Sequence, residues 1–187
     1  MKRKTISVTL VFFFLSGVSL SGQIYFTKSG KISFESETPL EKIEAVNAKA
    51  VSILNLDDHT LEFSVLIKGF YFPNALMQTH FNENYLLSDE YPKATFKSAP
   101  NQFEVIDLQI DSTYEVPVLG TLNVKGVDKE IESIATLQVD QGIIRGQASF
   151  VVSPADFQIE IPNLVKDKIA KEIHVKVDAE YEIYNKK

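Results

Sequence analysis

Apolar and polar residues alternate along most of the chain, a pattern typical of strands that bury one face. The alternation is clearest in residues 173–183, where apolar side chains occupy every second position and mostly charged ones lie between them. An antiparallel sheet with one face on a core and the other in water produces this pattern. Turn residues separate the earlier segments of this kind, which are residues 24–36, 43–54, 61–70, 95–97, 103–110, 114–124, 131–139 and 143–152.

These segments predict an all-β domain of about eight antiparallel strands, closed into a barrel or packed as a sandwich. Segments 43–54 and 61–70 are predicted to form a hairpin, as are 131–139 and 143–152. Pro117 and Gly120 favour an edge position or a bulge in the strand at 114–124. Residues 154–171 are less regular, and a helical turn is expected at 165–170.

One stretch departs from the alternation and predicts a short amphipathic helix over residues 74–87. Apolar residues recur there at helical spacing, beginning with Leu76 and Met77 and ending with Leu86. Asn74 is a good N-cap, and Pro92 requires the helix to end before it. The stretch therefore predicts either a helix that fills the core or a lid over an apolar cavity.

The N-terminus has the features of a secretory signal peptide. Lys2, Arg3 and Lys4 precede a short apolar run, and small residues follow it up to Gly22. We therefore expect residues 1–22 to be removed near Gly22–Gln23, which leaves one domain, 23–187, in the periplasm or outside the cell. No stable membrane anchor is expected after this cleavage, because the apolar run is too short for a convincing transmembrane span.

Composition narrows the classes of partner. Residues 1–22 contain three basic residues and no acid, so their removal takes the net charge from −6 to −9. A strongly negative chain argues against a nucleic-acid partner and against charge-driven binding of anionic lipids. The chain has no cysteine, which excludes disulfides and thiol chemistry, whereas 13 Phe and 7 Tyr supply bulky side chains for a β-rich core.

Catalytic and metal-binding signatures are absent from the sequence. The histidines His59, His80 and His174 fall on different predicted elements, and no phosphate-binding or nucleophile motif is present. His80 would need a nearby carboxylate to act in acid–base chemistry. We therefore expect no enzymatic activity, no metal and no cofactor.

Several motifs, taken together, resemble the YceI-like family of periplasmic polyisoprenoid-binding proteins. They begin with an early strand that ends in Ile-Ser-Phe34 and continue with YPKATF at 91–96, LGTLNVKGV at 119–127 and Asp156-Phe157. The resemblance covers nearly all of residues 23–187. Two positions differ from the pattern common in the family, since the first strand lacks a nearby His and Gln158 replaces the Gly that often follows Asp-Phe.

The resemblance implies an eight-stranded antiparallel, lipocalin-like β-barrel covered by the helix at 74–87. Its interior would hold a long apolar ligand, such as a quinone tail or a polyprenyl chain. His80 and Tyr91 are candidates for a polar mouth. The candidate residues for the apolar channel are Phe34, Phe63, Val65, Ile67, Met77, Phe81, Tyr85, Phe96, Leu122, Phe150, Val175 and Val177.

Other functions remain open at this point. A barrel with a filled core and no ligand would act as an interaction or stress-response module, with the strand at Pro117 as its contact edge. A hydrolase or isomerase that uses His80 is the third hypothesis. A homodimer is compatible with the sequence, which does not determine the oligomeric state.

Overall fold

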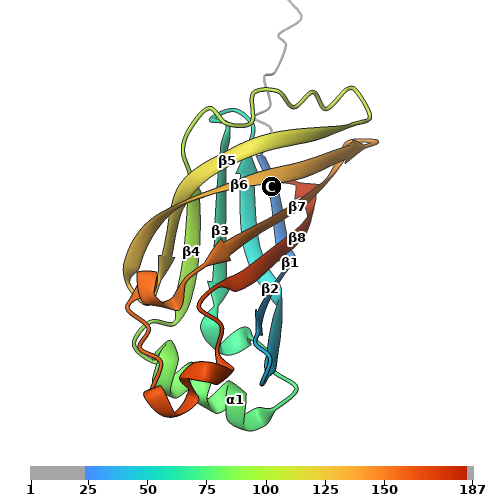
Figure 1. Ribbon diagram of the computed structural model, residues 1–187. Helices are drawn as coiled ribbons and strands as arrows, with labels where there is room; N and C mark the ends of the chain where they lie inside the picture. The colour runs from blue at the N-terminus through green and yellow to red at the C-terminus, as the bar shows by residue number, and fades with distance from the viewer. Residues whose placement is uncertain (1–23, 185–187) are drawn as a thin grey trace, which may run out of the picture.

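Eight antiparallel strands form a closed barrel in the computed structural model, which describes residues 24–184 (Figure 1). The expected signal peptide, 1–22, lies outside the described residues. Each strand pairs with its neighbours in sequence, and β1 closes the barrel against β8. The strands are β1 (Ile24–Glu37), β2 (Lys42–Asn55), β3 (Thr60–Leu66), β4 (Lys93–Ser98), β5 (Ser112–Val124), β6 (Val127–Asp140), β7 (Ile143–Val152) and β8 (Ile173–Ile183).

The predicted all-β barrel is confirmed, and the alternation explains its closure. Phe34 of β1 lies opposite Val175 of β8, and both side chains point into the barrel. Exposed charged residues such as Lys176 lie between the inward positions. The expected two pieces at 24–36 are one strand with register shifts around Gly30. A bulge at this position bends the strand without ending it.

The third strand is shorter than the sequence predicts, because it ends at Leu66 rather than Phe70. A 3-10 turn, Ile67–Gly69, follows it. The buried side chain of Asn47 donates a hydrogen bond from Nδ2 to the Leu66 carbonyl oxygen at 2.9 Å. A Cβ on Gly69 would lie 2.5 Å from Asn47 Nδ2, so only glycine allows this close approach.

The strand expected at 103–110 is wrong, because this segment is part of a loop over one end of the barrel. Backbone hydrogen bonds from Ile106 N to Phe103 O and from Ile110 N to Asp107 O form turns there. Phe103 is 1% exposed and packs into the core, whereas Val105 is 61% exposed. The apolar side chains are therefore buried singly rather than along one face of a strand.

The predicted helix is present at the opposite end of the barrel (Figure 1). It comprises α1 (Ala75–His80) and a π-helical turn, Phe81–Tyr85. The Asn74 side chain accepts hydrogen bonds from the backbone N–H groups of Leu76 and Met77, as expected of an N-cap. No residue of α1 is fully buried, so the helix covers the barrel end without entering the core.

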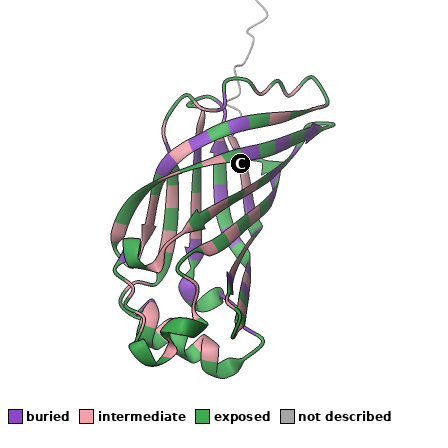
Figure 2. Ribbon diagram, in the orientation of Figure 1, coloured by how far each residue is buried: buried purple, intermediate pink, exposed green. Residues whose placement is uncertain are grey.

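The barrel interior is divided into a filled half and a half that faces α1. In the filled half, buried side chains from seven strands and the 99–111 loop pack together. Figure 2 shows buried positions along the strands, whereas the helix and the turns at its end are mostly exposed or intermediate. Packed side chains therefore close the barrel end away from α1. The end at α1 is covered instead by the helix and by short turns.

One of those segments runs between β7 and β8, and we call residues 153–172 the strap. Strand β6 pairs with β7 only through Ala135–Asp140 in the described chain, so its other half has no strand beside it on that side. The 3-10 turn Pro154–Phe157 contacts β6 in this gap, and a second 3-10 turn, Asn163–Lys168, follows near α1 (Figure 1). The strap thus completes the barrel wall.

Pro117 lies where β5 has a strand on one side only. It pairs with Ile134 of β6, whereas β4 pairs with β5 only from Gly120 to Asn123. The expected edge position is therefore correct locally, although the 99–111 loop covers this edge. The Ala99 N–H donates to the Leu119 carbonyl oxygen at 2.8 Å, and Gln102 Oε1 accepts from the Leu119 N–H.

Candidate functional site

A cavity of about 520 Å³ occupies the half of the barrel that faces α1. Its lining is almost entirely apolar and comes from every strand, from the helix and from the strap. The volume falls within the range of about 300–1,000 Å³ that is usual for small-molecule sites. The expectation of a fully filled barrel therefore does not fit this structure.

A cluster of four phenylalanine rings forms one wall of the cavity. Phe34 and Phe81 stack with their ring centroids 5.4 Å apart, and Phe70 and Phe72 lie 5.4 and 5.8 Å from Phe34. Centroid distances of this size are favourable for aromatic pairs. The rings come from β1, from the turn after β3 and from the helix, so the cluster attaches the helix to the barrel.

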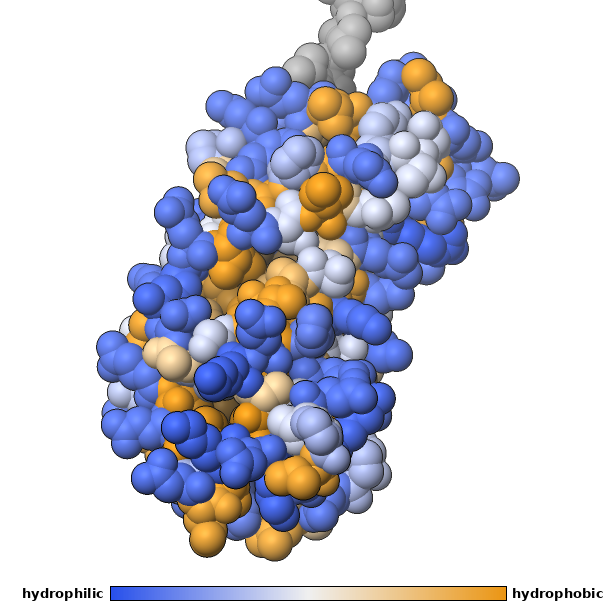
Figure 3. All heavy atoms as spheres, in the orientation of Figure 1, coloured by the Kyte–Doolittle hydropathy of each residue, from blue (hydrophilic) through white to orange (hydrophobic). Residues whose placement is uncertain are grey.

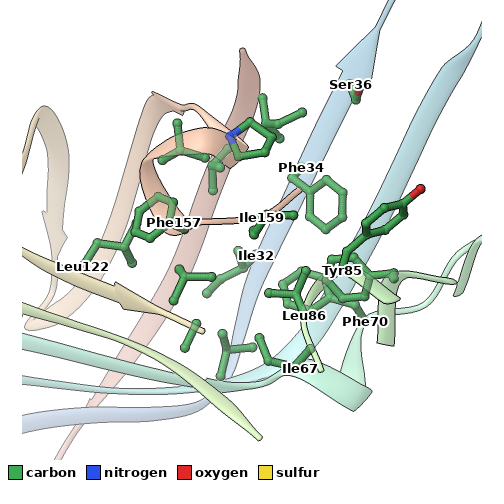
Figure 4. Close-up of a pocket in the computed structure, with 18 of the residues that line it drawn as sticks. Ile32, Phe34, Ser36, Ile67, Phe70, Tyr85, Leu86, Leu122, Phe157 and Ile159 are labelled. Carbon is green, nitrogen blue, oxygen red and sulfur yellow. The ribbon is translucent and has the colours of Figure 1, made fainter. Parts of the chain in front are cut away.

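Figure 4 shows how the two sides of the cavity face each other. Phe34, Phe70 and Tyr85 lie on one side, and Leu122 and Phe157 lie on the other. Burial raises the pKa of the Tyr85 phenol above its ordinary value. Apart from the charged residues Glu41 and Lys168, the cavity presents a mostly apolar surface.

All twelve residues proposed for the apolar channel line this cavity. His80 also lines it, at the exposed end of α1. Tyr91 does not, and its expected place at the mouth is corrected by the structure. Its ring instead packs against Gly126 in the β5–β6 turn, where a Cβ on the glycine would lie 2.9 Å from the ring.

The strap supplies lining residues that the sequence analysis missed. Alternation of apolar and polar residues from Phe157 to Ile161 was a signal for them, although Pro162 ends this short pattern. Phe157 is 3% exposed and lies in the gap beside β6. The apolar residues of the strap that line the cavity are Pro154, Phe157, Ile159, Ile161, Val165 and Ile169.

Polar lining residues gather at the α1 end, which is the mouth of the cavity. Lys168 Nζ of the strap lies 3.5 Å from Glu41 Oε2, in the turn between β1 and β2. The buried Ser36 hydroxyl accepts a hydrogen bond from the Ala170 N–H at 2.9 Å. These two contacts hold the strap against the first hairpin. The exposed residues Asn74 and His80 complete the polar rim.

The geometry offers little for catalysis or metal binding. Within residues 24–184, His80 has no hydrogen bond or ion pair to a carboxylate, and no three His, Asp or Glu side chains are grouped as metal ligands. In the same part of the chain, no helix has the length and apolar character needed to cross a membrane. What the site provides is apolar surface with a polar rim.

Comparison with solved structures identifies similar folds. A polyisoprenoid-binding domain from Saccharophagus degradans, implicated in plant cell wall breakdown, superposes with a TM-score of 0.73 at 15% identity, covering 88% of this chain and 100% of its own. Burkholderia cenocepacia BcnA superposes with a TM-score of 0.69 at 14% identity, covering 82% of this chain and 96% of its own. The Campylobacter jejuni YCEI protein superposes with a TM-score of 0.55 at 16% identity, and the match covers both chains fully. Identities this low support the shared fold alone.

Comparison by sequence gives the family directly. No curated protein sequence matches the chain significantly. The profile of the YceI-like domain, however, matches residues 6–181, which is most of the chain. This match agrees with the closed eight-stranded barrel and with its structural neighbours. The chain therefore belongs to the YceI-like domain family.

Proposed function

We propose that the protein is a lipid carrier that holds one long apolar molecule, of the isoprenoid class, in the barrel cavity. The cavity itself supports this proposal most directly, because it is roomy, apolar and closed at the end away from α1. The polyisoprenoid-binding domain of Saccharophagus degradans, which shares the fold, suggests the ligand class. A quinone or a polyprenyl compound fits this description.

The lining explains how such a ligand would be held. Each buried methylene-sized group contributes about 0.8 kcal/mol, so roughly five to twenty buried carbons would offset a binding cost of about 4–15 kcal/mol. The apolar wall offers few hydrogen bonds along the tail, so it would select for shape rather than for chemistry. The head group would lie at the mouth, near Glu41, Lys168 and His80.

The proposal includes the place of action. A signal peptide at 1–22, cleaved near Gly22–Gln23, would deliver the domain 23–187 to the periplasm or the exterior. No covalent cofactor is needed, since the lipid would be held by burial alone. A carrier for an apolar molecule is useful in an aqueous compartment, where free isoprenoids would aggregate or remain in membranes.

The test is native mass spectrometry of the mature protein purified from a host periplasm, followed by organic extraction. We expect a bound species of isoprenoid mass, which Phe81→Asp and Phe150→Asp should remove because each places a charge in the cavity wall. Ile134→Asp is the control, since Ile134 is 61% exposed on the outer face of β6. A ligand-free mass, with no uptake of added quinone or polyprenol, would refute the carrier function.

A further inference from the structure

The cavity ends at one row of residues that face inward on four neighbouring strands. The members of this row lie opposite one another in register and all line the cavity, and they are Ile32 of β1, Val177 of β8, Ala148 of β7 and Ala135 of β6. We call them the end row. Ala135 and Ala148 also form the pair at which β6 and β7 begin to diverge. The deepest part of the cavity on this side therefore lies beside two small side chains.

The next inward row, two residues further from α1, is filled by core side chains. Ala179, Gly146 and Leu137 occupy it in register, and all three are buried and line no part of the cavity. A Cβ on Gly146 would lie 2.9 Å from Leu137 Cδ2 and 3.5 Å from Tyr181 Cε2, so these two side chains lie against the glycine. Leu137 and Tyr181 therefore form a floor directly below the end row.

Phe96 forms the floor on the other side of the barrel. Its ring packs directly on the backbone of Gly120 in β5, where a Cβ would overlap the ring. The same ring lines the cavity and contacts the filled core. Phe63, which pairs with Phe96, has both of these contacts as well. Side chains from β3, β4, β6 and β8 thus close the cavity at one depth. Figure 3 shows that most of the outer surface around this barrel is hydrophilic, so the apolar interior ends at the floor and at the mouth.

The distance from the mouth to this floor is short. Ile173, Val175 and Val177 are the inward residues of β8 that line the cavity, and at about 3.3 Å per residue they span about 13 Å. The cavity volume of about 520 Å³ holds roughly 15–20 carbon atoms, if each takes up about 30 Å³, as a water molecule does in the liquid. A tail with many more carbons must leave the remainder outside the mouth.

We propose that this floor limits the ligand to a buried tail of about three or four isoprene units, whose end lies against Ala135 and Ala148. The limit rests on the proposed carrier function and adds the length of the ligand to it. The two alanines are specificity-determining residues, because a larger side chain at either position would fill the space that the last isoprene unit needs. Ligands with much longer tails would be held with most of the tail unburied.

A limit of this kind matters most when the ligand comes from a bilayer. Carbons that move from the bilayer into the cavity exchange one apolar environment for another, so their transfer costs little. Carbons that leave the bilayer and stay outside the cavity become exposed to water, which is unfavourable. Extraction should therefore favour tails that fit and discriminate against tails that extend past the mouth.

The experiment is extraction of prenols from phosphatidylcholine vesicles by the mature protein. The vesicles contain equal amounts of farnesol, geranylgeraniol and solanesol, which have three, four and nine isoprene units, and mass spectrometry quantifies the prenols bound to the separated protein. We expect wild type to take up at least tenfold more geranylgeraniol than solanesol. Ala148→Phe should lower geranylgeraniol uptake about tenfold and farnesol uptake much less, since the added ring fills the end of the cavity. Ratios between variant and wild type cancel the different affinities of the prenols for the bilayer.

Ser149→Phe is the matched control, because it places the same ring on the exposed outer face of β7. It should leave the uptake of all three prenols unchanged. Ala148→Leu adds less volume than Ala148→Phe and is the second variant if the larger ring prevents folding. We expect it to shift the preference toward farnesol in the same direction, by a smaller factor.

Two results would overturn the length limit and leave the carrier function in place. They are equal uptake of solanesol and geranylgeraniol by wild type, and an unchanged ratio of geranylgeraniol to farnesol in the folded Ala148 variants. If no prenol is taken up, straight-chain alcohols of increasing length replace the prenols in the vesicles. A limit that Ala148→Leu shortens would then support the floor and refute only the isoprenoid class, whereas no uptake of either series would refute both proposals.

Discussion

At the scale of single residues, two hydroxyl groups form a hydrogen-bonded pair inside the filled half of the barrel. Tyr181 Oη lies 2.9 Å from Ser52 Oγ. Ser52 Oγ donates its one proton to the Glu62 carbonyl oxygen at 2.8 Å, so Tyr181 must donate to Ser52. Tyr181 is buried, and burial raises the pKa of its phenol. The folded state therefore favours the protonated form.

This pair makes the stability of the protein depend on pH in the alkaline range. We expect Tyr181→Phe to cost about 0.5–1.5 kcal/mol near neutral pH, the usual worth of one hydrogen bond. As the pH rises above about 10, the unfolded chain loses the phenol proton while the folded chain keeps it. Wild type then loses stability that the variant does not lose. Urea unfolding at neutral and alkaline pH measures the difference in the free energy of unfolding between wild type and Tyr181→Phe. This difference should shrink as the pH rises, and a constant difference would contradict the raised pKa.

Gln158, directly after Asp156-Phe157, has a left-handed backbone conformation with a φ of 54°. Residues other than glycine pay about 1–2 kcal/mol for this region, whereas glycine costs about 0.5–1 kcal/mol more in unfolded-state entropy. We expect Gln158→Gly to raise the free energy of unfolding by up to about 1 kcal/mol, measured in urea. Gln158→Ala is the control and should bring no gain. Loss of stability in both variants would show that the Gln158 side chain, rather than the backbone, matters here.

At the scale of elements, the helix depends on its cap and on one aromatic face. Asn74 accepts from two backbone N–H groups, while Phe81 contacts the other rings of the phenylalanine cluster. Because α1 has no fully buried residue, its attachment to the barrel is weak relative to that of the strands. An element of this kind can open while the barrel stays folded.

Weakening the cap should therefore loosen the helix and accelerate lipid release. We expect Asn74→Ala to cost about 0.5–2 kcal/mol of helix stability, and Asn74→Asp, which keeps the cap, to cost much less. Hydrogen exchange of the helix amides and the rate of lipid transfer to vesicles measure the two effects. If exchange accelerates and transfer does not, the helix is not part of the route for the lipid.

The strap is the other element that can move, and the chain allows a clean test of it. The Ala170 N–H donates a 2.9 Å hydrogen bond to Ser36 Oγ, so the two residues are close neighbours and are the positions we choose for an engineered disulfide. Since the chain has no cysteine, Ser36→Cys with Ala170→Cys would create the only pair. We expect the oxidised form to exchange lipid much more slowly than the reduced form, whereas Ser36→Cys alone should not respond to oxidation. Equal rates of lipid exchange in the oxidised and reduced forms would show that the lipid does not enter or leave past the strap.

The sequence predicted the elements whose burial follows a period. Strand β8 could be placed from its alternation, and α1 from its helical spacing and cap, because each turns one apolar face inward, although no residue of α1 is fully buried. The loop at 103–110 was misread as a strand because its apolar residues do not share one buried face. Phe103 is buried individually, against a barrel end that only the tertiary structure creates. The strap was missed as part of the site because its role depends on the divergence of β6 from β7, which no local pattern reports.

At the scale of the whole molecule, one barrel combines two interiors with different purposes. The filled half contains residues such as Phe103 and Tyr181 and leaves no space for a ligand. The half at α1 contains the cavity and relies on the helix and strap to close it. The filled half supplies most of the packed core, and the other half supplies the space for a ligand. Stability and lipid binding should therefore respond to different substitutions.

Two phenylalanines test this separation directly. Phe103→Ala should lower the free energy of unfolding by about 3–5 kcal/mol, because it leaves a void in a packed core, but it should leave lipid affinity unchanged while the protein is folded. Phe81→Ala should cost less stability, since its ring faces existing space, yet weaken lipid binding about tenfold or more through the lost apolar contact. Urea unfolding without ligand and titration with a quinone measure both quantities. If folded Phe103→Ala also binds the quinone more weakly than wild type, the two halves are coupled. The shape of the cavity would then depend on the packing of the closed end.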